Sequence, residues 1–132
     1  MKRSIVLSLL ALTGCAMVSN QSKDLIRTRN AVSFSIVNSP DMTGYYYGPR
    51  TLGTLSAWCS MSKGDVLVAD ATSAQTLKIS GFPKDYGHVV AAGWERDKRF
   101  FVHLTPGADM GTVIYCDLKK KEVTEVKHWA AW

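Results

Sequence analysis

The chain has 132 residues, 46% of them hydrophobic, and a formal net charge of +5 at pH 7. This length suits one domain that buries a core of its own. The positive charge is small and mixed with negative charge along the chain, which argues against a nucleic-acid-binding protein.

The first residues of the chain have the pattern of an export signal. Lys2 and Arg3 form a positive start, and the stretch 4–12 after them is apolar apart from two serines. About nine residues are too few to span a bilayer, which needs roughly 20, but they suit the apolar region of a secretory signal. The segment 16–24 turns polar, so no stop-transfer helix follows, and we expect residues 1–14 to be a signal peptide.

The end of this signal, Leu12-Thr13-Gly14-Cys15, resembles the lipobox of bacterial lipoproteins, which consists of Leu, two small residues and Cys. The resemblance is confined to the start of the chain and implies nothing about the fold that follows. It implies that Cys15 is acylated, that the mature chain begins there, and that the lipid anchors the protein to a membrane, which two or more acyl chains do stably. The alternative is an ordinary secretory signal in which Cys15 is incidental.

The residue after the lipobox carries a further implication of the same resemblance. In enterobacterial lipoproteins an Asp at that position tends to retain the protein at the inner membrane, and this chain has Ala16 instead. The resemblance therefore implies a protein anchored in the outer membrane and facing the periplasm. Loss of Lys2 and Arg3 with the signal would lower the net charge from +5 to +3.

Residues 15–30 are polar and show little periodicity, which predicts a lipidated tether between the membrane and the folded domain. Leu25 and Ile26 could begin a short helix there. From Ala31 onward the hydrophobic pattern has a period of two, as in half-buried strands. The pattern predicts strands at 32–36, 54–61, 66–68, 77–79, 88–94, 99–105, 111–118 and 123–129.

Turn signals rich in Gly, Pro, Asp and Ser recur between these strands, and no long helical stretch intervenes. Such a pattern is typical of an all-β domain built as a small antiparallel meander, closed either as a sandwich or as a barrel. We therefore expect the β domain to span residues 31–132, with the N-terminal lipoprotein signal and tether in front of it.

Two cysteines, Cys59 and Cys116, remain when the lipobox cysteine is set aside. The bacterial periplasm is oxidising, so the pair predicts a disulfide. Cys116 shares a predicted strand face with Ile114 and Leu118, and a bond to it would join two strands through the core. The alternatives are two buried free thiols, or a catalytic cysteine, for which the neighbouring sequence supplies no base.

Motifs for chemistry are scarce. His88, His103 and His128 are far apart in the sequence, and no His-x-x-x-His or Cys-x-x-Cys spacing is present, so we predict no metal site. No Gly-x-Ser-x-Gly nucleophile motif and no glycine-rich phosphate loop are present. The carboxylates lie mostly in predicted turns, where such groups are usually solvated. We therefore expect a non-catalytic protein that uses no cofactor.

The strongest candidate for a binding surface is aromatic. Tyr45, Tyr46 and Tyr47 are consecutive, so in a strand at least one of them points away from the core, and Arg50 follows closely. Tyrosine and arginine are enriched in the residues that dominate protein interfaces. The alternative is that two of the tyrosines pack inward and the third lies flat on the surface.

Two functional hypotheses follow. The first is an envelope lipoprotein whose β domain binds a protein or peptidoglycan partner through the Tyr45–Arg50 surface, with the anchor raising its effective concentration. The second is an inhibitor or immunity lipoprotein that blocks a toxin, a lytic enzyme or a phage with a protruding loop, for which 81–87 and 106–111 are candidates.

The basic run Lys119–Lys121 predicts a solvated turn or, alternatively, a contact with anionic lipid headgroups.

Overall fold

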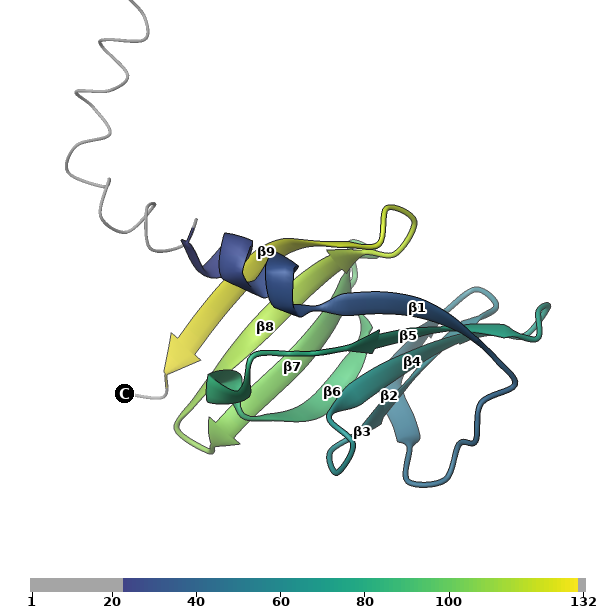
Figure 1. Ribbon diagram of the computed structural model, residues 1–132, viewed down its shortest axis with the longest axis horizontal. Helices are drawn as coiled ribbons and strands as arrows, with labels where there is room; N and C mark the ends of the chain where they lie inside the picture. The colour runs from purple at the N-terminus through teal and green to yellow at the C-terminus, as the bar shows by residue number, and fades with distance from the viewer. Residues whose placement is uncertain (1–22, 131–132) are drawn as a thin grey trace, which may run out of the picture.

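The computed structural model describes residues 23–130 and, for residues 47–50, the backbone alone. The predicted signal peptide and Cys15 lie outside the described residues, as do the side chains of Tyr47 and Arg50. The chain forms two antiparallel sheets, confirming the predicted all-β class, with strand orders β1-β5-β4-β3-β2 and β6-β7-β8-β9 (Figure 1). The two sheets enclose one core, with β6 lying against β2 and β3.

Each strand pairs with its neighbour through an antiparallel ladder. The first sheet contains β1 (Ser33–Asn38), β2 (Tyr46–Leu52), β3 (Leu55–Ser60), β4 (Asp65–Asp70) and β5 (Gln75–Ser80). A short 3-10 helix, η1 (Lys84–Tyr86), leads into the second sheet. That sheet contains β6 (His88–Trp94), β7 (Phe100–Gly107), β8 (Met110–Asp117) and β9 (Glu122–Ala130).

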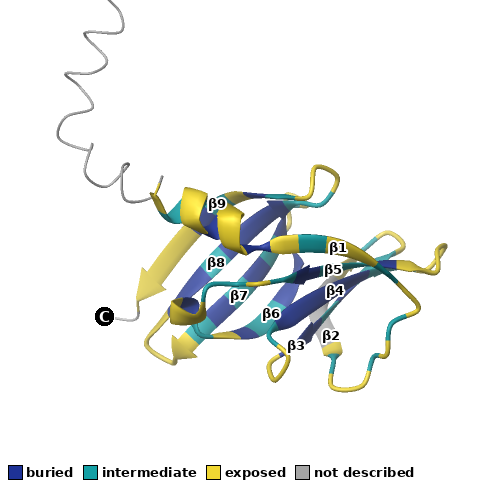
Figure 2. Cartoon of the chain, in the orientation of Figure 1, coloured by how far each residue is buried: buried dark blue, intermediate teal, exposed yellow. Residues whose placement is uncertain are grey.

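The core lies between the two sheets and follows the predicted alternation. Phe100, Val102 and Leu104 of β7 are all buried, and Ile114 of β8 is completely so. Figure 2 shows the same contrast, with dark blue strand centres and exposed turns. Because consecutive residues of a strand point to opposite faces, a period of two in the sequence places one set of side chains in the core.

A helix over residues 23–31 precedes β1, where the sequence predicted a tether over 15–30. Leu25, Thr28 and Val32 lie on one face of it, and Thr28 is completely buried. The tether prediction is therefore wrong for residues 23–30. The buried side of this helix has a threonine at its centre, so the sequence shows only a weak hydrophobic periodicity there. Among the described residues, no helix has both the length and the hydropathy needed to cross a membrane.

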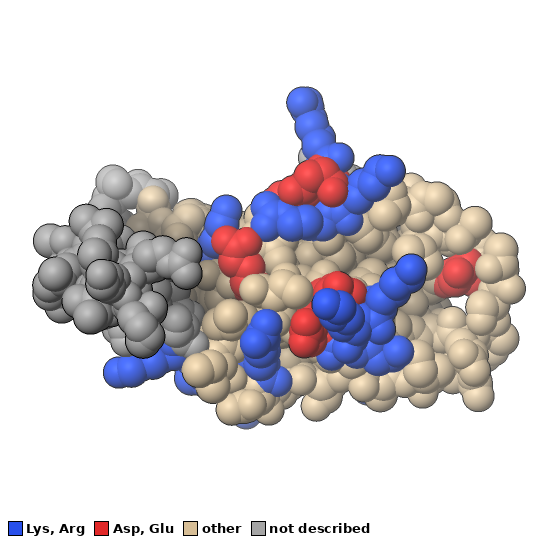
Figure 3. Space-filling view, turned by 90° about the horizontal axis from the view of Figure 1, so that it is seen from above, with Lys and Arg blue, Asp and Glu red and all other residues tan. Residues whose placement is uncertain are grey.

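The helix lies along β9 and continues directly into β1, so it connects the edge strands of the two sheets (Figure 1). At its start Asp24 Oδ2 lies 2.7 Å from His128 Nε2, and near its end Arg29 Nε donates to the Val123 carbonyl at 2.6 Å. Acidic and basic side chains are interspersed on this side of the molecule (Figure 3). The described part of the folded domain thus includes the helix 23–31 as well as the strands that follow.

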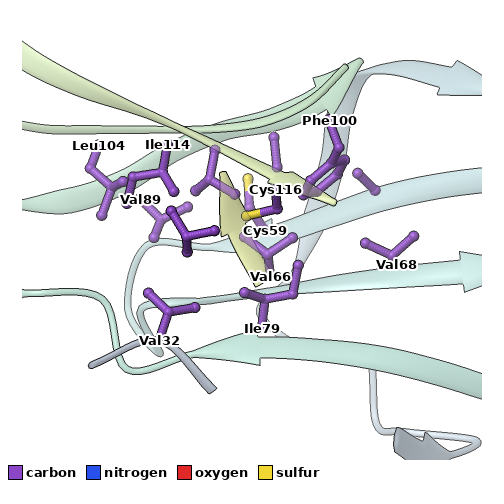
Figure 4. Close-up of a cluster of buried hydrophobic side chains, with 14 of the residues drawn as sticks. Val32, Cys59, Val66, Val68, Ile79, Val89, Phe100, Leu104, Ile114 and Cys116 are labelled. Carbon is purple, nitrogen blue, oxygen red and sulfur yellow. The ribbon is translucent and has the colours of Figure 1, made fainter. Parts of the chain in front are cut away.

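The structure corrects the prediction for the cysteine pair. Cys59 and Cys116 are free thiols here, although both are buried in the core and their side chains point toward one another in Figure 4. Burial raises the pKa of Cys116 to about 12 and raises that of Cys59 as well. Since the thiolate is the reactive form, burial makes both thiols of the folded protein poor nucleophiles.

We expect iodoacetamide to alkylate neither cysteine in the folded protein, and both cysteines after unfolding in urea without a reductant. The reason is that the folded thiols are inaccessible and remain protonated. Mass spectrometry of the two alkylated samples measures this directly. If the unfolded chain accepted the reagent only after treatment with a reductant, the disulfide that the sequence predicted would be present.

Candidate functional site

The five-stranded sheet has an unusual outer face, on the side away from the core. Trp58, Leu67 and Lys78 lie on this face as direct neighbours on β3, β4 and β5. Directly paired residues share a face of the sheet, and Leu67 is only 1% exposed there. A strand buried on both sides needs cover on its outer face, and part of that cover comes from the loop 39–45, which lies between β1 and β2.

A cavity of about 510 Å³ lies between this loop and the sheet, and we name it the Tyr45 pocket. It combines an apolar floor with two lysines, two aspartates and one tyrosine. Its lining consists of Val37, Pro40, Asp41, Tyr45, Lys63, Asp65, Leu67 and Lys78. A concave, partly apolar surface with a few polar groups is the usual form of a binding site.

Asp65 is the most informative residue of the Tyr45 pocket. Its side chain is 8% exposed, and its Oδ2 lies 3.7 Å from Lys78 Nζ. Its other oxygen, Oδ1, is buried and has no hydrogen-bond partner among the described residues. A buried acceptor left unpaired is unfavourable by roughly 1–3 kcal/mol, and by more when it is charged. The carboxylate of Asp65 is therefore only partly paired within the described residues, through the contact of its Oδ2 with Lys78.

Tyr45 is held in the pocket by polar contacts on both sides. Burial, together with a hydrogen bond to Asp65, raises the pKa of the Tyr45 phenol, so it remains a neutral donor. Lys63 Nζ lies 4.7 Å from the centre of the Tyr45 ring and donates to the Thr43 carbonyl at 2.9 Å. These contacts fix the ring on the rim of the cavity and lower the ordering cost of binding.

The structure does not bring the predicted aromatic surface together. Tyr46 pairs directly with Cys59, whose side chain is in the core, so Tyr46 lies on the opposite face of the sheet from the Tyr45 pocket. Tyr46 remains 43% exposed because β2 is an edge strand. Of the four predicted residues only Tyr45 is placed in the pocket, since the side chains of Tyr47 and Arg50 lie outside the described residues.

The remaining members of the pocket come from strands and turns that the sequence pattern did not connect.

Ser60 at the end of β3 and Lys63 in the following turn have Ser-x-x-Lys spacing, which in some enzymes marks a nucleophile and its base. Here Ser60 is completely buried, and its Oγ accepts the backbone N–H of Lys63 at 3.1 Å. The Lys63 ammonium is directed to Thr43 instead, so this pair stabilises a turn rather than forming a catalytic dyad.

The two loops proposed for an inhibitor lie side by side. Gly87, at the end of the 81–87 loop, packs so closely on the backbone of Thr105 and Pro106 that a Cβ there would overlap both residues. Pro106 begins the second candidate loop, 106–111. The antiparallel pairing of β6 with β7, in which His88 lies opposite Thr105, brings the two loops together.

A series of polar side-chain contacts connects the helix to the second sheet. His128 Nδ1 lies 2.9 Å from the Thr112 hydroxyl, and its Nε2 lies 2.7 Å from Asp24. Thr112 is 4% exposed, so its hydroxyl is not presented to a substrate. Beside it, Arg27 binds Asp85 through two hydrogen bonds of 2.9 and 3.1 Å, which hold the pKa of that carboxyl below its usual value. These groups attach the helix to the domain.

His103 is half-buried, and its Nε2 accepts the indole N–H of Trp129 at 3.1 Å. Burial lowers the pKa of His103, which keeps this nitrogen available as an acceptor.

Within residues 23–130 no group of three or more His, Cys, Asp or Glu side chains is close enough to hold a metal ion. A comparison with protein-family models, curated proteins and solved structures finds no match to this chain.

Proposed function

We propose that the protein is a lipoprotein of the bacterial cell envelope whose small β domain binds a protein or cell-wall partner without catalysing a reaction. Cys15 would carry the lipid, and the outer membrane, on its periplasmic side, would hold the anchor. The lipobox supports the anchor, and the Tyr45 pocket supports the binding role. The observation that carries the binding role is the cavity of about 510 Å³ over the outer face of the sheet, where Tyr45, Lys63 and Lys78 surround an apolar floor.

The mechanism is confinement followed by recognition. A lipid anchor keeps the domain in a thin layer at the membrane, which raises its effective concentration at a target held in the same layer. The partner group that fits the Tyr45 pocket has polar atoms on an apolar stem, because the pocket combines Leu67 and Val37 with the polar side chains of Lys63, Lys78 and Asp41. An amide side chain, which both donates and accepts hydrogen bonds, has this chemistry.

The anchor is tested by replacing its sulfur. We expect the native protein to sediment with the membrane fraction and to have the mass of a chain acylated at Cys15, and we expect the Cys15→Ser variant to lose both properties. Acyl chains contribute about 0.8 kcal/mol per buried CH₂ group, so their loss removes most of the membrane affinity. Fractionation and mass spectrometry measure the two properties. A wild-type protein recovered in the soluble fraction at its unmodified mass would contradict the anchor.

The binding surface is tested by site-specific photo-crosslinking in living cells. We expect p-benzoylphenylalanine in place of Tyr45 to capture a partner, because the ring lies on the rim of the pocket. The matched control places the same group at Ile36, which is 51% exposed on the other face of the same sheet. Adducts at neither position, or the same adduct at both, would remove the pocket as the binding site.

The adjacent loops support an inhibitor or immunity protein as the second candidate. Two loops that pack on each other through Gly87 offer one joint surface, which an inhibitor could present to the cleft of an enzyme or toxin. The identity of the crosslinked partner separates the two candidates. A lytic enzyme or a toxin favours the inhibitor, whereas a porin, an assembly factor or peptidoglycan favours the binding module.

A further inference from the structure

We propose that one side of the domain, formed by the helix 23–31 and the segment 117–130, docks on an anionic phospholipid surface. We name this side the basic face. The proposal rests on the proposed lipid anchor, because the anchor brings this side of the domain to a membrane. It adds an orientation to that anchor, with the helix and β9 against the bilayer.

The net charge of the domain is concentrated on the basic face. Its two segments hold seven Lys and Arg residues and four Asp and Glu residues, whereas the rest of the chain after the signal holds seven of each sign. All seven cations are exposed, and all four carboxylates are half-buried. The cations are Lys23, Arg27, Arg29, Lys119, Lys120, Lys121 and Lys127.

The packing of the helix places several of these cations in sequence along β9. Asp24 contacts His128 near the end of β9, and Arg29 contacts Val123 near its beginning, so the helix runs along β9 in the opposite direction. Lys23 therefore lies at one end of the helix, while Arg29 lies beside the start of β9. The turn that contains Lys119–Lys121 directly precedes β9, so it extends the series beyond Arg29.

Most of these charges are available to an external anion. Arg27 is bound to Asp85, and Lys127 Nζ lies 3.8 Å from Glu125. The other five cations form no ion pair with another described residue. In Figure 3 blue side chains project outward on this side, with acidic groups lying among them. An anionic surface can therefore contact several lysines at once without first breaking ion pairs inside the protein.

The length of chain before the helix brings this face close to the lipid. Only residues 16–22 separate Cys15 from Lys23, and eight Cα–Cα steps span at most about 28 Å. Electrostatic attraction to a charged membrane decays over a Debye length of about 8 Å at physiological ionic strength. The anchor therefore holds the basic face within reach of the bilayer, where each Lys or Arg strengthens binding to anionic lipid about fivefold.

The orientation is tested with the native full-length lipoprotein in vesicles of phosphatidylcholine, with or without 30 mol% phosphatidylglycerol. We expect amides in 23–31 and 117–122 to exchange with deuterium more slowly on the anionic vesicles than on the neutral ones. This protection should disappear at high salt. Lys120→Glu changes the charge by two units, so it should weaken the docking by about 30-fold and abolish the protection.

The matched control is Lys84→Glu, which makes the same change at an exposed lysine outside the basic face. We expect this variant to keep the protection. Equal loss in both variants would overturn the proposal, because only total charge would then matter. Equal exchange on the two kinds of vesicle would also overturn it. Protection that occurs in isolated native membranes but not on anionic vesicles would assign the face to another envelope component and equally reject lipid docking.

Failure of the anchor and failure of the orientation give different results. A chain that lacks acyl groups by mass spectrometry, yet floats with anionic vesicles in a salt-sensitive and Lys120-dependent manner, would contradict the anchor and support the basic face. An acylated chain that floats with both kinds of vesicle and shows no difference in exchange would support the anchor and overturn the basic face.

Discussion

Replacing Gly87 with alanine is expected to lower the free energy of unfolding by more than about 3 kcal/mol. Gly87 follows η1 with φ 92° and ψ −145°, a conformation that residues with a Cβ rarely adopt. A Cβ would also overlap the backbone of Thr105 and Pro106, which cannot rotate away as a side chain can. The conformational strain and the overlap both act on the folded state, so their effects accumulate.

The matched control is Gly64→Ala, in the β3–β4 turn. Gly64 also has a positive φ, of 70°, but nothing lies within 4 Å of its Cβ position. Strain alone should therefore destabilise the control by about 1–2 kcal/mol. Urea denaturation of the two variants separates strain from overlap. An effect of Gly87→Ala no larger than that of Gly64→Ala would show that the two loops do not pack as described.

Replacing Ile79 with alanine should have a similarly large effect, about 3–4 kcal/mol. Ile79 is completely buried in the core between the two sheets, next to Val66 on β4. Removing three carbon atoms there loses the transfer free energy of the side chain and leaves a cavity that two packed sheets can close only in part.

Ile36 provides the comparison for Ile79, because it is the same residue type in the same sheet and is 51% exposed. We expect Ile36→Ala to change stability by no more than about 1 kcal/mol. The midpoint of urea unfolding, with an unchanged denaturant slope, measures both effects. Equal destabilisation by the two substitutions would mean that the core is not where the sheets place it.

The strands could be predicted because their burial is periodic in the sequence. β7 shows this best, since Phe100, Val102 and Leu104 alternate with less buried neighbours. β2 was harder to predict, because Gly48 and Pro49 mark turns in most sequences. It continues through them with a register irregularity between Tyr47 and Thr51, which an edge strand tolerates.

The helix 23–31 was missed because what stabilises it is distant in the sequence. Thr28 bonds Tyr86, Arg29 bonds the Val123 carbonyl, and Asp24 contacts His128, with separations of 58, 94 and 104 residues. A short helix without a strong apolar stripe depends on such tertiary contacts rather than on its own propensity. Single-sequence patterns report local order, and these contacts follow from the packing of the whole domain.

The candidate site was predictable only in part for the same reason. The tyrosine run directed attention to Tyr45, but the register of β3, β4 and β5 decides that Asp65 and Lys78 lie beside it. One local signal was present, since Asp65 directly precedes the buried run Val66–Val68. An acidic residue at the start of a strand buried on both faces is a reason to expect a polar group held in a pocket.

The attachment of the helix to β9 determines how the domain would respond to tension on the proposed anchor. A pull on the chain from before residue 23 reaches the helix first, and Arg27, Thr28 and Arg29 pass the load to η1 and β9 before it arrives at β1. A protein with the proposed anchor would therefore have to lose these contacts before tension could peel β1 from the sheet.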